Sequence, residues 1–382
     1  MTILVAIFVF LFAYPFFVYP VLLKLTRSAA RKPEPEREHP EMDWSRAPRV
    51  ALVICALNEA KVIAAKLENS LALDYPDGKL TTYLVNDGSE DRTLDIARQY
   101  EARGIRIISR EKRRGKVTNL NEVVPTREEG IVVQSDANVI YHPKAIRHLV
   151  ARMQDPTVGC VSGRVILQET TGDLRQGEES YYSLEWFLQE KASEIYSMCG
   201  VDGAMHAYRR ELFKPCPNDT LIEDFVMGMQ FVAQGYRVVY EPDATAWERG
   251  PETLAEEFRR KVRIAAGAAQ ALIRGNGVPV SNAPGGFWFV WISHKLLRWL
   301  SPVFGILALV CAGFAAGELV PRIVLAGFAV IAALALVRWL TGLSNALLNT
   351  PFYFLFGQVA VARGLVRGVL GTQSVLWEKA KR

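Results

Sequence analysis

Long segments without charged side chains lie near both ends of the chain and most restrict how it folds. Residues 1–23 contain no charged residue, and neither do residues 299–317. An apolar helix of about 20 residues spans the roughly 30 Å hydrocarbon core of a lipid bilayer. We therefore predict a transmembrane anchor at 1–23 and two transmembrane helices at 299–318 and 319–340.

The residues that follow the first apolar segment predict its orientation. Lys24, Arg27, Arg31 and Lys32 come directly after it, and basic residues collect on the cytoplasmic side of membrane helices. The chain is therefore predicted to be a multi-pass protein of the cell (inner) membrane with its centre in the cytoplasm. Residues 24–48 are rich in proline and glutamate, which is typical of an extended linker.

Three further segments complete the predicted membrane part. Residues 287–300 mix three tryptophans with basic side chains, a pattern that favours a helix lying in the membrane interface. Residues 341–370 are apolar but interrupted by Asn345 and Pro351, which predicts interfacial or re-entrant helices. Residues 371–382 form a basic cytoplasmic tail. Three spans are expected in total, with four as the alternative.

The centre of the chain, residues 49–280, has the pattern of an α/β domain. Short runs rich in Val and Ile alternate with segments whose apolar residues recur at helical spacing. The runs are at 50–55, 83–85, 105–108 and 131–133, and the helical segments are at 59–73, 91–102 and 143–153. Such continuous apolar runs predict buried parallel strands joined by helices.

Charge and cysteine content exclude other classes of protein. The 45 basic and 40 acidic residues give a net charge of +5, too small an excess to indicate a nucleic-acid-binding protein. The five cysteines include no C-x-x-C pair, so neither a disulfide framework nor a zinc cluster is predicted.

Polar side chains follow three of the predicted strands. Asn58 and Glu59 follow the first strand, Asp87 the second, and Asp136 and Asn138 the fourth. Ligands of α/β sheets bind at the carboxyl ends of the strands, so we expect these residues to converge on one edge. Asp136 with Asn138 offers oxygen donors that suit Mg²⁺ or Mn²⁺ shared with substrate phosphates. The alternative is that each residue caps a helix or a turn.

A basic turn lies between the third and fourth predicted strands. Its sequence is Arg113-Arg114-Gly115-Lys116, and it stands at the start of a predicted helix that contains Asn119. Such a turn is suited to binding phosphate. The alternative is a solvated basic loop.

Taken in order, six segments resemble the membrane-associated family 2 glycosyltransferases, which include hyaluronan, chitin and cellulose synthases. The segments are Ala56-Leu57-Asn58-Glu59, Asn86-Asp87-Gly88-Ser89, Gly115-Lys116 with Asn119, Ser135-Asp136-Ala137-Asn138, Gly203 to Arg209, and Ile222-Glu223-Asp224. The resemblance implies a GT-A fold, a Rossmann-like domain with a mixed, mainly parallel sheet flanked by transmembrane and interfacial helices. It also implies a nucleotide-sugar donor, most commonly a UDP-sugar.

The same resemblance implies roles for individual residues. Asn58, Glu59 and Asp87 would surround the base and ribose of the donor, and Lys116 would reach its diphosphate. Asp136 looks like the first member of the family's metal-binding D-x-D motif. Asn138 stands where the last Asp of that motif usually is, and the implied metal is Mg²⁺ or Mn²⁺.

Glu223-Asp224 matches the family's T-E-D motif and implies that Asp224 is the catalytic base, supported by Glu223. A carboxylate that takes the proton of an acceptor hydroxyl permits a single displacement that inverts the anomeric centre. The alternative is an acidic helix start stabilised by the helix dipole. Arg260 and Arg263 lie in the stretch that corresponds to the Q-x-x-R-W motif of processive members, and Ile264 replaces its tryptophan.

These features predict an inverting, metal-dependent hexosyltransferase that extends a polysaccharide or a lipid-linked glycan at the membrane. The alternative is a single-addition transferase that acts on a lipid-linked acceptor. Few spans make a channel within one chain difficult, so a homo-oligomer or a secretion partner is expected for export. A sugar-phosphate nucleotidyltransferase, which needs no membrane spans, and an inactive scaffold subunit are less favoured.

Overall fold

The computed structural model describes residues 1–25, 42–168, 173–251 and 253–376, and the side chains of 173–182 fall outside this description. Its centre is an eight-stranded sheet in the order β3-β2-β1-β4-β7-β6-β8-β5. The strands are β1 Val50–Ala56, β2 Leu80–Asn86, β3 Arg106–Ser109, β4 Ile131–Asp136, β5 Val139–Tyr141, β6 Val158–Gln168, β7 Met205–Arg209 and β8 Arg237–Arg249.

Most strand pairs in the first half of the sheet are parallel. β1 pairs in parallel with β2 and β4, and β2 with β3, whereas β7 is antiparallel to both β4 and β6. The carboxyl ends of β1, β2 and β4 therefore meet at one edge, as their apolar sequences predicted. The expected mixed, mainly parallel α/β fold is confirmed.

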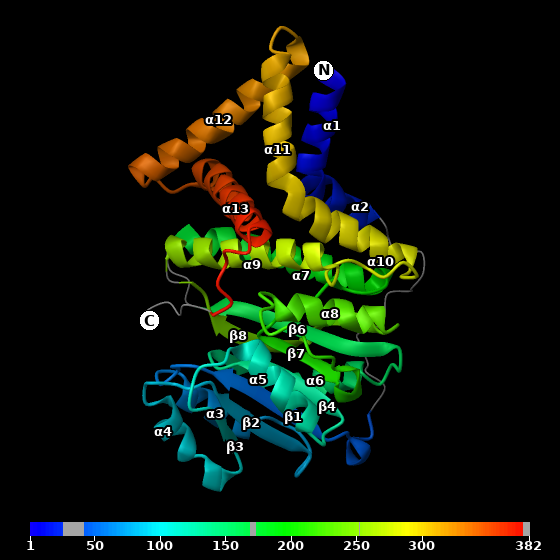
Figure 1. Cartoon of the computed structure of the whole chain (residues 1–382), viewed down its shortest axis with the longest axis vertical. Helices are drawn as coiled ribbons and strands as arrows, with labels where there is room; N and C mark the ends of the chain where they lie inside the picture. Colours follow the sequence, from blue (N-terminus) through cyan, green and yellow to red (C-terminus); the bar gives the residue numbers. More distant parts are fainter. Residues whose placement is uncertain (26–41, 169–172, 252, 377–382) are drawn as a thin grey trace.

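Helices cover both faces of the sheet (Figure 1). One face packs against α3 Ile63–Leu71, α4 Thr93–Arg98 and α6 Ala145–Arg152, and the other against α5 Lys116–Val123, α7 Asp173–Ile195, α8 Glu223–Ala233 and α9 Leu254–Arg274. Along β1, Leu52 and Ile54 face the first layer while Ala51 and Val53 face the second. Both faces of this strand are buried, which explains its continuous apolar sequence.

The first predicted helix begins later than its apolar pattern indicated. Helical spacing starts at Glu59, but α3 begins at Ile63. Asn58 has a left-handed backbone with φ of 54°, and its side-chain oxygen accepts a hydrogen bond from Glu90 N at 2.8 Å. These contacts hold the residues after β1 in a turn, so the polar end of the strand stays next to the end of β2.

Three helices are long and apolar enough to cross a membrane by length and composition: Thr2–Leu25, Gly285–Phe314 and Leu319–Thr341. The first joins α1 Thr2–Ala13 and α2 Tyr19–Leu25 through a π-helical turn, and the second joins α10 Gly285–Val290 and α11 Leu297–Phe314 in the same way. The third is α12. Figure 1 shows α1, α11 and α12 projecting away from the sheet. Residues 26–41 of the expected linker and 377–382 of the expected tail lie outside the described residues.

Helices α7, α9 and α13 Ala346–Val369 lie between the sheet and the projecting helices (Figure 1). Residues 346–369, where interfacial or re-entrant helices were expected, form one continuous helix that starts at the cap Asn345 and contains Pro351. Two glycines bring α13 close to α9: a Cβ at Gly364 would lie 2.4 Å from Val262 O, and one at Gly368 would lie 2.4 Å from Ala266 O. Glycine at both positions therefore lets the two helices touch.

Short 3₁₀ turns connect several of these elements. They span Trp44–Arg46, Glu101–Arg103, Val124–Thr126 and Arg210–Leu212.

Candidate active site

Asp87, directly after β2, organises the basic turn. Its Oδ1 accepts hydrogen bonds from Arg114 N at 2.7 Å and from Asn119 Nδ2 at 2.7 Å, and its Oδ2 accepts one from Gly115 N at 2.9 Å. Carboxylates that accept backbone N–H groups fix the path of the chain. Both oxygens of Asp87 are thus engaged in holding the turn that leads into α5.

The next residue lets that turn pass close to the strand end. Gly88 has φ of 72°, and a Cβ there would lie 2.7 Å from both Arg113 N and the carbonyl carbon of Lys112. Only glycine adopts this conformation without strain while leaving room for another backbone. Gly115 has φ of 90° immediately before Lys116, so a second glycine directs the chain into the helix.

Lys116 lies between two carboxylates from distant parts of the sequence. Its Nζ is 2.9 Å from Asp136 Oδ1 at the end of β4 and 3.0 Å from Glu223 Oε1 at the start of α8. Although burial opposes the charge of Lys116, Asp136 and Glu223 hold the pKa of Lys116 well above its usual range. The fold therefore brings three of the predicted site residues into direct contact.

The two adjacent carboxylates of α8 differ in proton affinity. Burial raises the pKa of Glu223, but the Lys116 ammonium outweighs burial and lowers it below its ordinary value. Burial and the neighbouring charge of Glu223 raise the pKa of Asp224 to about 6. Oδ1 of Asp224 accepts a hydrogen bond from Phe225 N at 2.8 Å. Paired carboxylates with separated pKa values are characteristic of acid–base sites.

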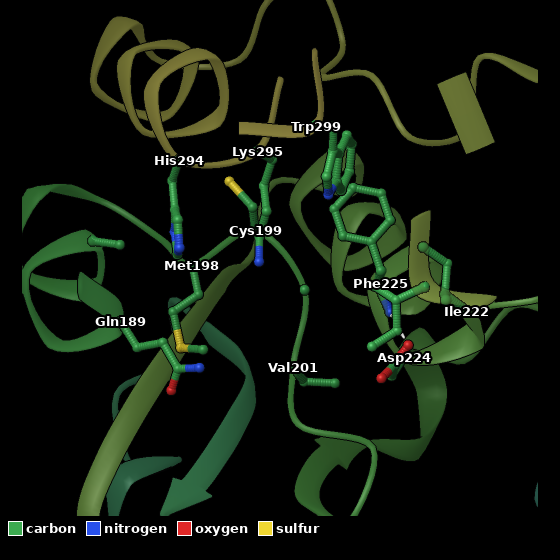
Figure 2. A pocket seen from close by; sticks show the side chains of 13 residues that line it. Gln189, Met198, Cys199, Val201, Ile222, Asp224, Phe225, His294, Lys295 and Trp299 are labelled. Carbon is green, nitrogen blue, oxygen red and sulfur yellow. Dashed lines mark hydrogen bonds between the residues drawn. The ribbon is translucent and has the colours of Figure 1, made fainter. Parts of the chain in front are cut away.

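Asp224 lines a cavity of about 150 Å³ between α8, the end of α7 and the helix formed by α10 and α11 (Figure 2). Val201 and Ile264 contribute to its walls, and Lys295 and Trp299 enter from the long apolar helix. Figure 2 shows Asp224 on one side of this space and Lys295 on the other. The base predicted from the sequence therefore has an adjoining space for a small group.

The turn after β4 carries the two predicted metal ligands. Asp136 contacts Lys116, whereas Asn138 donates a hydrogen bond through Nδ2 to Glu248 Oε1 at 3.1 Å. The side chain of Asp136 is 37% exposed, and a carboxylate with an amide oxygen two positions further along the chain has the oxygen chemistry that Mg²⁺ and Mn²⁺ prefer. These residues fit a cation whose shell is completed by substrate phosphates, and the described residues contain no closed cage of three acidic, His or Cys side chains.

A buried lysine holds this turn from inside the domain. Lys66 on α3 is 0% exposed, and its Nζ donates to Ser135 Oγ at 2.7 Å and to Val139 O at 2.6 Å. The ammonium also lies 4.1 Å from the ring centroid of Tyr141, and burial lowers its pKa to about 7. Lys66 thereby joins the two ends of the segment that contains Asp136. Sequence reasoning missed it because lysines are rarely buried.

The other residues that were predicted to bind the donor lie at less central positions. Asn58 N donates to Ser89 Oγ at 2.9 Å and Glu59 N donates to Thr93 Oγ1 at 2.7 Å, so both residues lie beside the segment that follows Asp87. Arg260 forms an ion pair with Glu257 one turn earlier on α9, at 2.8 Å. The structure thus places Arg260 on a charged face of α9.

Arg263 is oriented toward the start of α8. Its Nε and Nη2 donate to the carbonyl oxygen of Leu221 at 3.3 and 3.1 Å. Leu221 lies just before Glu223 and Asp224, so Arg263 supports the segment that carries both carboxylates. Ile264, the next residue, is 43% exposed and lines the cavity.

His206 on β7 is buried, and burial lowers its pKa to about 4, so the ring is neutral. Its Nδ1 is 2.8 Å from Asp202 O. Asp202 was missed by the sequence analysis: burial, followed by the charges of Glu248, Asp224 and Asp136, raises its pKa to about 7. The segment Gly203 to Arg209 was noted for its resemblance, but an Asp one residue earlier gave no separate signal.

One aromatic side chain at the cavity has no counterpart among the residues predicted for the site. Trp186 packs under Arg164, with 4.0 Å between its ring centroid and the guanidinium carbon, and the ring centroid of Trp247 lies 6.3 Å from that of His142. Trp299 lines the cavity instead and packs edge-on against Phe225 at 5.2 Å. Its position at the start of an apolar segment concealed this role.

Comparisons with known proteins agree with this geometry. A family model described as "Glycosyltransferase like family 2" matches residues 48–267, more than half of the chain. The chain is 24% identical over 241 residues to a poly-beta-1,6-N-acetyl-D-glucosamine synthase of Staphylococcus aureus (strain COL), covering 62% of this chain and 58% of that protein. It is 23% identical over 231 residues to the synthase of the same name from Staphylococcus epidermidis, with 59% and 56% covered. The chain thus spans less than two thirds of the length of these relatives.

A solved structure shares the fold over nearly the whole chain. The mannosyltransferase PcManGT from Pyrobaculum calidifontis, in complex with GDP-Man and Mn²⁺, superposes with a TM-score of 0.72. The match covers 97% of this chain and 100% of that one at 24% sequence identity. The likeness extends to the apolar helices on either side of the α/β domain.

Proposed function

The chain belongs to glycosyltransferase family 2, and on that premise we propose that it transfers a sugar from a nucleotide-sugar donor to a glycan or lipid-linked acceptor at the cytoplasmic face of the cell membrane. One observation carries the proposal: Lys116 joins Asp136 to Glu223 at the carboxyl edge of the sheet, with Asp224 next to Glu223 at the wall of a cavity. The three apolar helices support a site held at a membrane surface.

In this proposal the turn held by Asp87 binds the diphosphate of the donor. Backbone N–H groups at a helix start and the Lys116 ammonium attract phosphate oxygens. When the donor binds, its negative charge competes with Asp136 and Glu223 for Lys116. Asn58 and Glu59, beside the segment that follows Asp87, would contact the nucleoside, and a UDP-sugar is the first donor to test.

Asp224 is the proposed base. Its carboxylate takes the proton of the acceptor hydroxyl while that oxygen forms a bond to the anomeric carbon of the donor. The bond between the anomeric carbon and the diphosphate oxygen breaks, and the nucleoside diphosphate leaves with its electron pair. One displacement inverts the anomeric centre, and no second carboxylate acting as a nucleophile is needed.

A divalent cation fits the same edge. Mg²⁺ or Mn²⁺ would be held by Asp136 and the amide oxygen of Asn138 together with donor phosphates, and it would neutralise charge that develops on the leaving diphosphate. Glu248 orients Asn138 through their hydrogen bond of 3.1 Å. The fold relative PcManGT is in complex with GDP-Man and Mn²⁺, which supports testing both guanine and uracil nucleotides with this metal.

A donor screen on purified, detergent-solubilised protein tests the function. Release of nucleoside diphosphate from UDP-glucose, UDP-N-acetylglucosamine, UDP-glucuronate, UDP-galactose and GDP-mannose would be followed with Mg²⁺ or Mn²⁺. We expect turnover of one donor, abolished by EDTA and restored by metal. Absence of turnover with all five donors in the presence of membrane lipid extract would contradict the proposal, and turnover that persists in EDTA would remove the metal from it.

Single addition is the second candidate, and a specific observation favours it. The residue at the position of the acceptor-stacking tryptophan is Ile264, and the cavity beside Asp224 has room for about one ring-sized group. Sizing the product separates the two candidates. A long polymer would indicate processive synthesis, as the name of the staphylococcal relatives suggests, and a product larger by one sugar would indicate single addition.

A further inference from the structure

The cavity beside Asp224 has a cation on the side nearest the apolar helices. Lys295 comes from the π-helical segment Trp291–Leu296, directly ahead of α11, and its side chain enters the cavity (Figure 2). Neither family resemblance nor the proposed base requires a lysine at this place. It is therefore an additional polar group at the space that adjoins the reacting centre.

The ion pairs around Lys295 leave its charge incompletely neutralised. The side chain of Glu185 on α7 is 14% exposed, and its Oε2 lies 2.8 Å from Arg298 Nη1 while its Oε1 lies 3.0 Å from His294 Nε2. Lys295 Nζ lies 4.0 Å from the same Oε1, at the outer limit of an ion pair. Among the ion pairs of the described side chains, this single carboxylate contacts two basic side chains, Arg298 and Lys295, besides His294. Arg298 takes the closer contact, so a positive charge remains at the cavity.

The other walls suit a sugar ring. Trp299 and Phe225 pack edge-on with ring centroids 5.2 Å apart, and both line the cavity together with Ile264. Aromatic side chains offer flat apolar surface with a polar edge. A volume of about 150 Å³ holds one ring and not an oligosaccharide. The opposite wall carries Asp224, the group proposed to take the acceptor proton.

We propose that this cavity binds the terminal sugar of an acceptor that carries a phosphate group, with Lys295 contacting the phosphate and Trp299 the sugar ring. The proposal rests on the proposed transferase function and specifies the acceptor class. The phosphate is that of a lipid, because Lys295 lies two residues before α11, which belongs to a helix long and apolar enough to cross a membrane. A lipid-linked sugar phosphate would thus approach along this helix, with its headgroup at Lys295 and its hydroxyl near Asp224.

Binding of two matched probes to the full chain in lipid nanodiscs tests this assignment without donor. One probe is glucose joined to an octyl chain through a phosphodiester, and the other is the neutral octyl glucoside. We expect the phosphate probe to bind about tenfold more tightly, the size of one charge-assisted contact. Octyl glucuronide, which carries a carboxylate on the ring instead, should not gain this advantage.

Variants assign the preference to individual side chains. Lys295→Met should lower the affinity for the phosphate probe to that for the neutral probe, and Lys295→Arg should keep most of the preference. Trp299→Leu should weaken both probes by a similar factor. Lys191→Met, which removes a lysine of α7 that pairs with Glu194 at 2.6 Å, is the matched control and should keep the preference.

Several outcomes would overturn the inference. Equal affinity of the wild-type protein for the phosphate and neutral probes would do so, as would an unchanged preference in Lys295→Met. Displacement of the phosphate probe by inorganic phosphate at the same concentration would indicate a simple anion site without sugar recognition. Donor turnover is measured separately. Turnover without a preference for the phosphate probe would support the transferase function and contradict the acceptor assignment. A preference for the phosphate probe without turnover of any donor would contradict both the transferase function and the acceptor role.

Discussion

Asp224 and Glu223 are neighbours in sequence but experience opposite electrostatic environments. Both lie in the first turn of α8, where the helix dipole favours negative charge. Glu223 contacts Lys116 at 3.0 Å and stays ionised. Asp224 has no such ion pair among the described residues, and burial together with the charge of Glu223 raises its pKa to about 6. One lysine therefore separates a permanently charged carboxylate from one that exchanges a proton near neutral pH.

This difference predicts a pH dependence of turnover. As the proposed base, Asp224 would have to be deprotonated to accept the proton of the acceptor hydroxyl, so the rate should rise with pH through about 6 and become constant above it. Below that value kcat/KM should fall about tenfold for each pH unit. A pH–rate profile at saturating metal measures this. A profile that is flat between pH 5 and 8 would contradict a base with this pKa.

Substitution of Asp224 should lower the transfer activity and raise the stability of the protein. Asp224→Asn is expected to bind the nucleotide but to lose transfer by about 100-fold or more. The carboxyl pKa rises from 3.8 to about 6 on folding, so the folded state disfavours the ionised form at pH 7.5. Each pKa unit corresponds to about 1.4 kcal/mol, and partial exposure reduces the effect, so the variant should gain about 1–3 kcal/mol of stability at pH 7.5.

The gain in stability of Asp224→Asn should be smaller at pH 4.5, where Asp224 is already protonated in the folded wild-type protein. Thermal or denaturant unfolding at both pH values measures the difference. Asp95→Asn, at an exposed position in the first turn of α4, controls for the change in net charge; it should leave turnover unchanged and alter stability by no more than about 1 kcal/mol. An Asp224→Asn protein that transfers sugar normally would remove Asp224 as the base.

Among elements, the contact between α9 and α13 connects the apolar helix α12 with the candidate active site, because α13 also packs against α12. α9 carries Arg263, which bonds to the start of α8, and Ile264, which lines the cavity. On its other side, α9 touches α13 through Gly364 and Gly368. Small residues let helix backbones approach closely, and a larger side chain at the contact must separate the helices.

Gly364→Leu should therefore destabilise the protein and lower turnover. Overpacking at such a contact costs about 1–3 kcal/mol, and displacement of α9 would disturb the cavity wall. Gly357→Ala in the same helix is the matched control, because a Cβ there has no neighbour within 4 Å. It should be neutral or slightly stabilising. Equal thermal stability and equal turnover of the two variants would show that the close contact is not needed.

At the scale of the whole molecule, the apolar helices share one end. The hydroxyl of Thr2 donates to the carboxylate of Glu318, which joins the start of α1 to the turn between α11 and α12. Figure 1 shows the amino terminus beside this turn, at the end of the molecule away from the sheet. If the domain is cytoplasmic, as the basic residues after the anchor predict, this end lies on the opposite side of the membrane.

Cysteine labelling in intact cells measures this arrangement. A cysteine introduced by Gly317→Cys, in the α11–α12 turn, should react with a membrane-impermeant maleimide added outside. Lys112→Cys, at the exposed residue directly before the basic turn of the domain, should react only after permeabilisation. The native cysteines are buried or half-buried, so their background should be low. The reverse labelling pattern would invert the proposed topology.

The sequence predicted much of the α/β core because its signals are local. The apolar runs at β1, β2 and β4 coincide with buried stretches of strand, and the run at the partly exposed edge strand β3 was also recognised, because each run contains its own signal. Strands β5, β6 and β8 were not predicted because they mix polar and apolar residues. Their pairing depends on strands that are distant in sequence: β6 pairs with β7 and β8, and β5 pairs with β8. The polar strand ends were found because turns after parallel strands collect functional groups.

The sequence predicted the residues of the candidate site better than it predicted the contacts between them. Asp136, Lys116 and Glu223 were each proposed, yet the lysine was expected at a diphosphate and not between two carboxylates. Lys66, Asp202 and Trp299 were missed because a buried lysine, a loop aspartate and a tryptophan at the edge of an apolar segment have more common explanations.

By itself, the sequence determined where strands, helices and apolar segments form, since hydrophobic periodicity and the absence of charge act within a few turns of chain. Only the tertiary structure decided which side chains meet. The contact of Lys116 with Glu223 and the entry of Lys295 and Trp299 into the cavity beside Asp224 join residues that are far apart in sequence. Their positions depend on how the helix layers pack on the sheet, a global balance of burial and shape that no local pattern encodes.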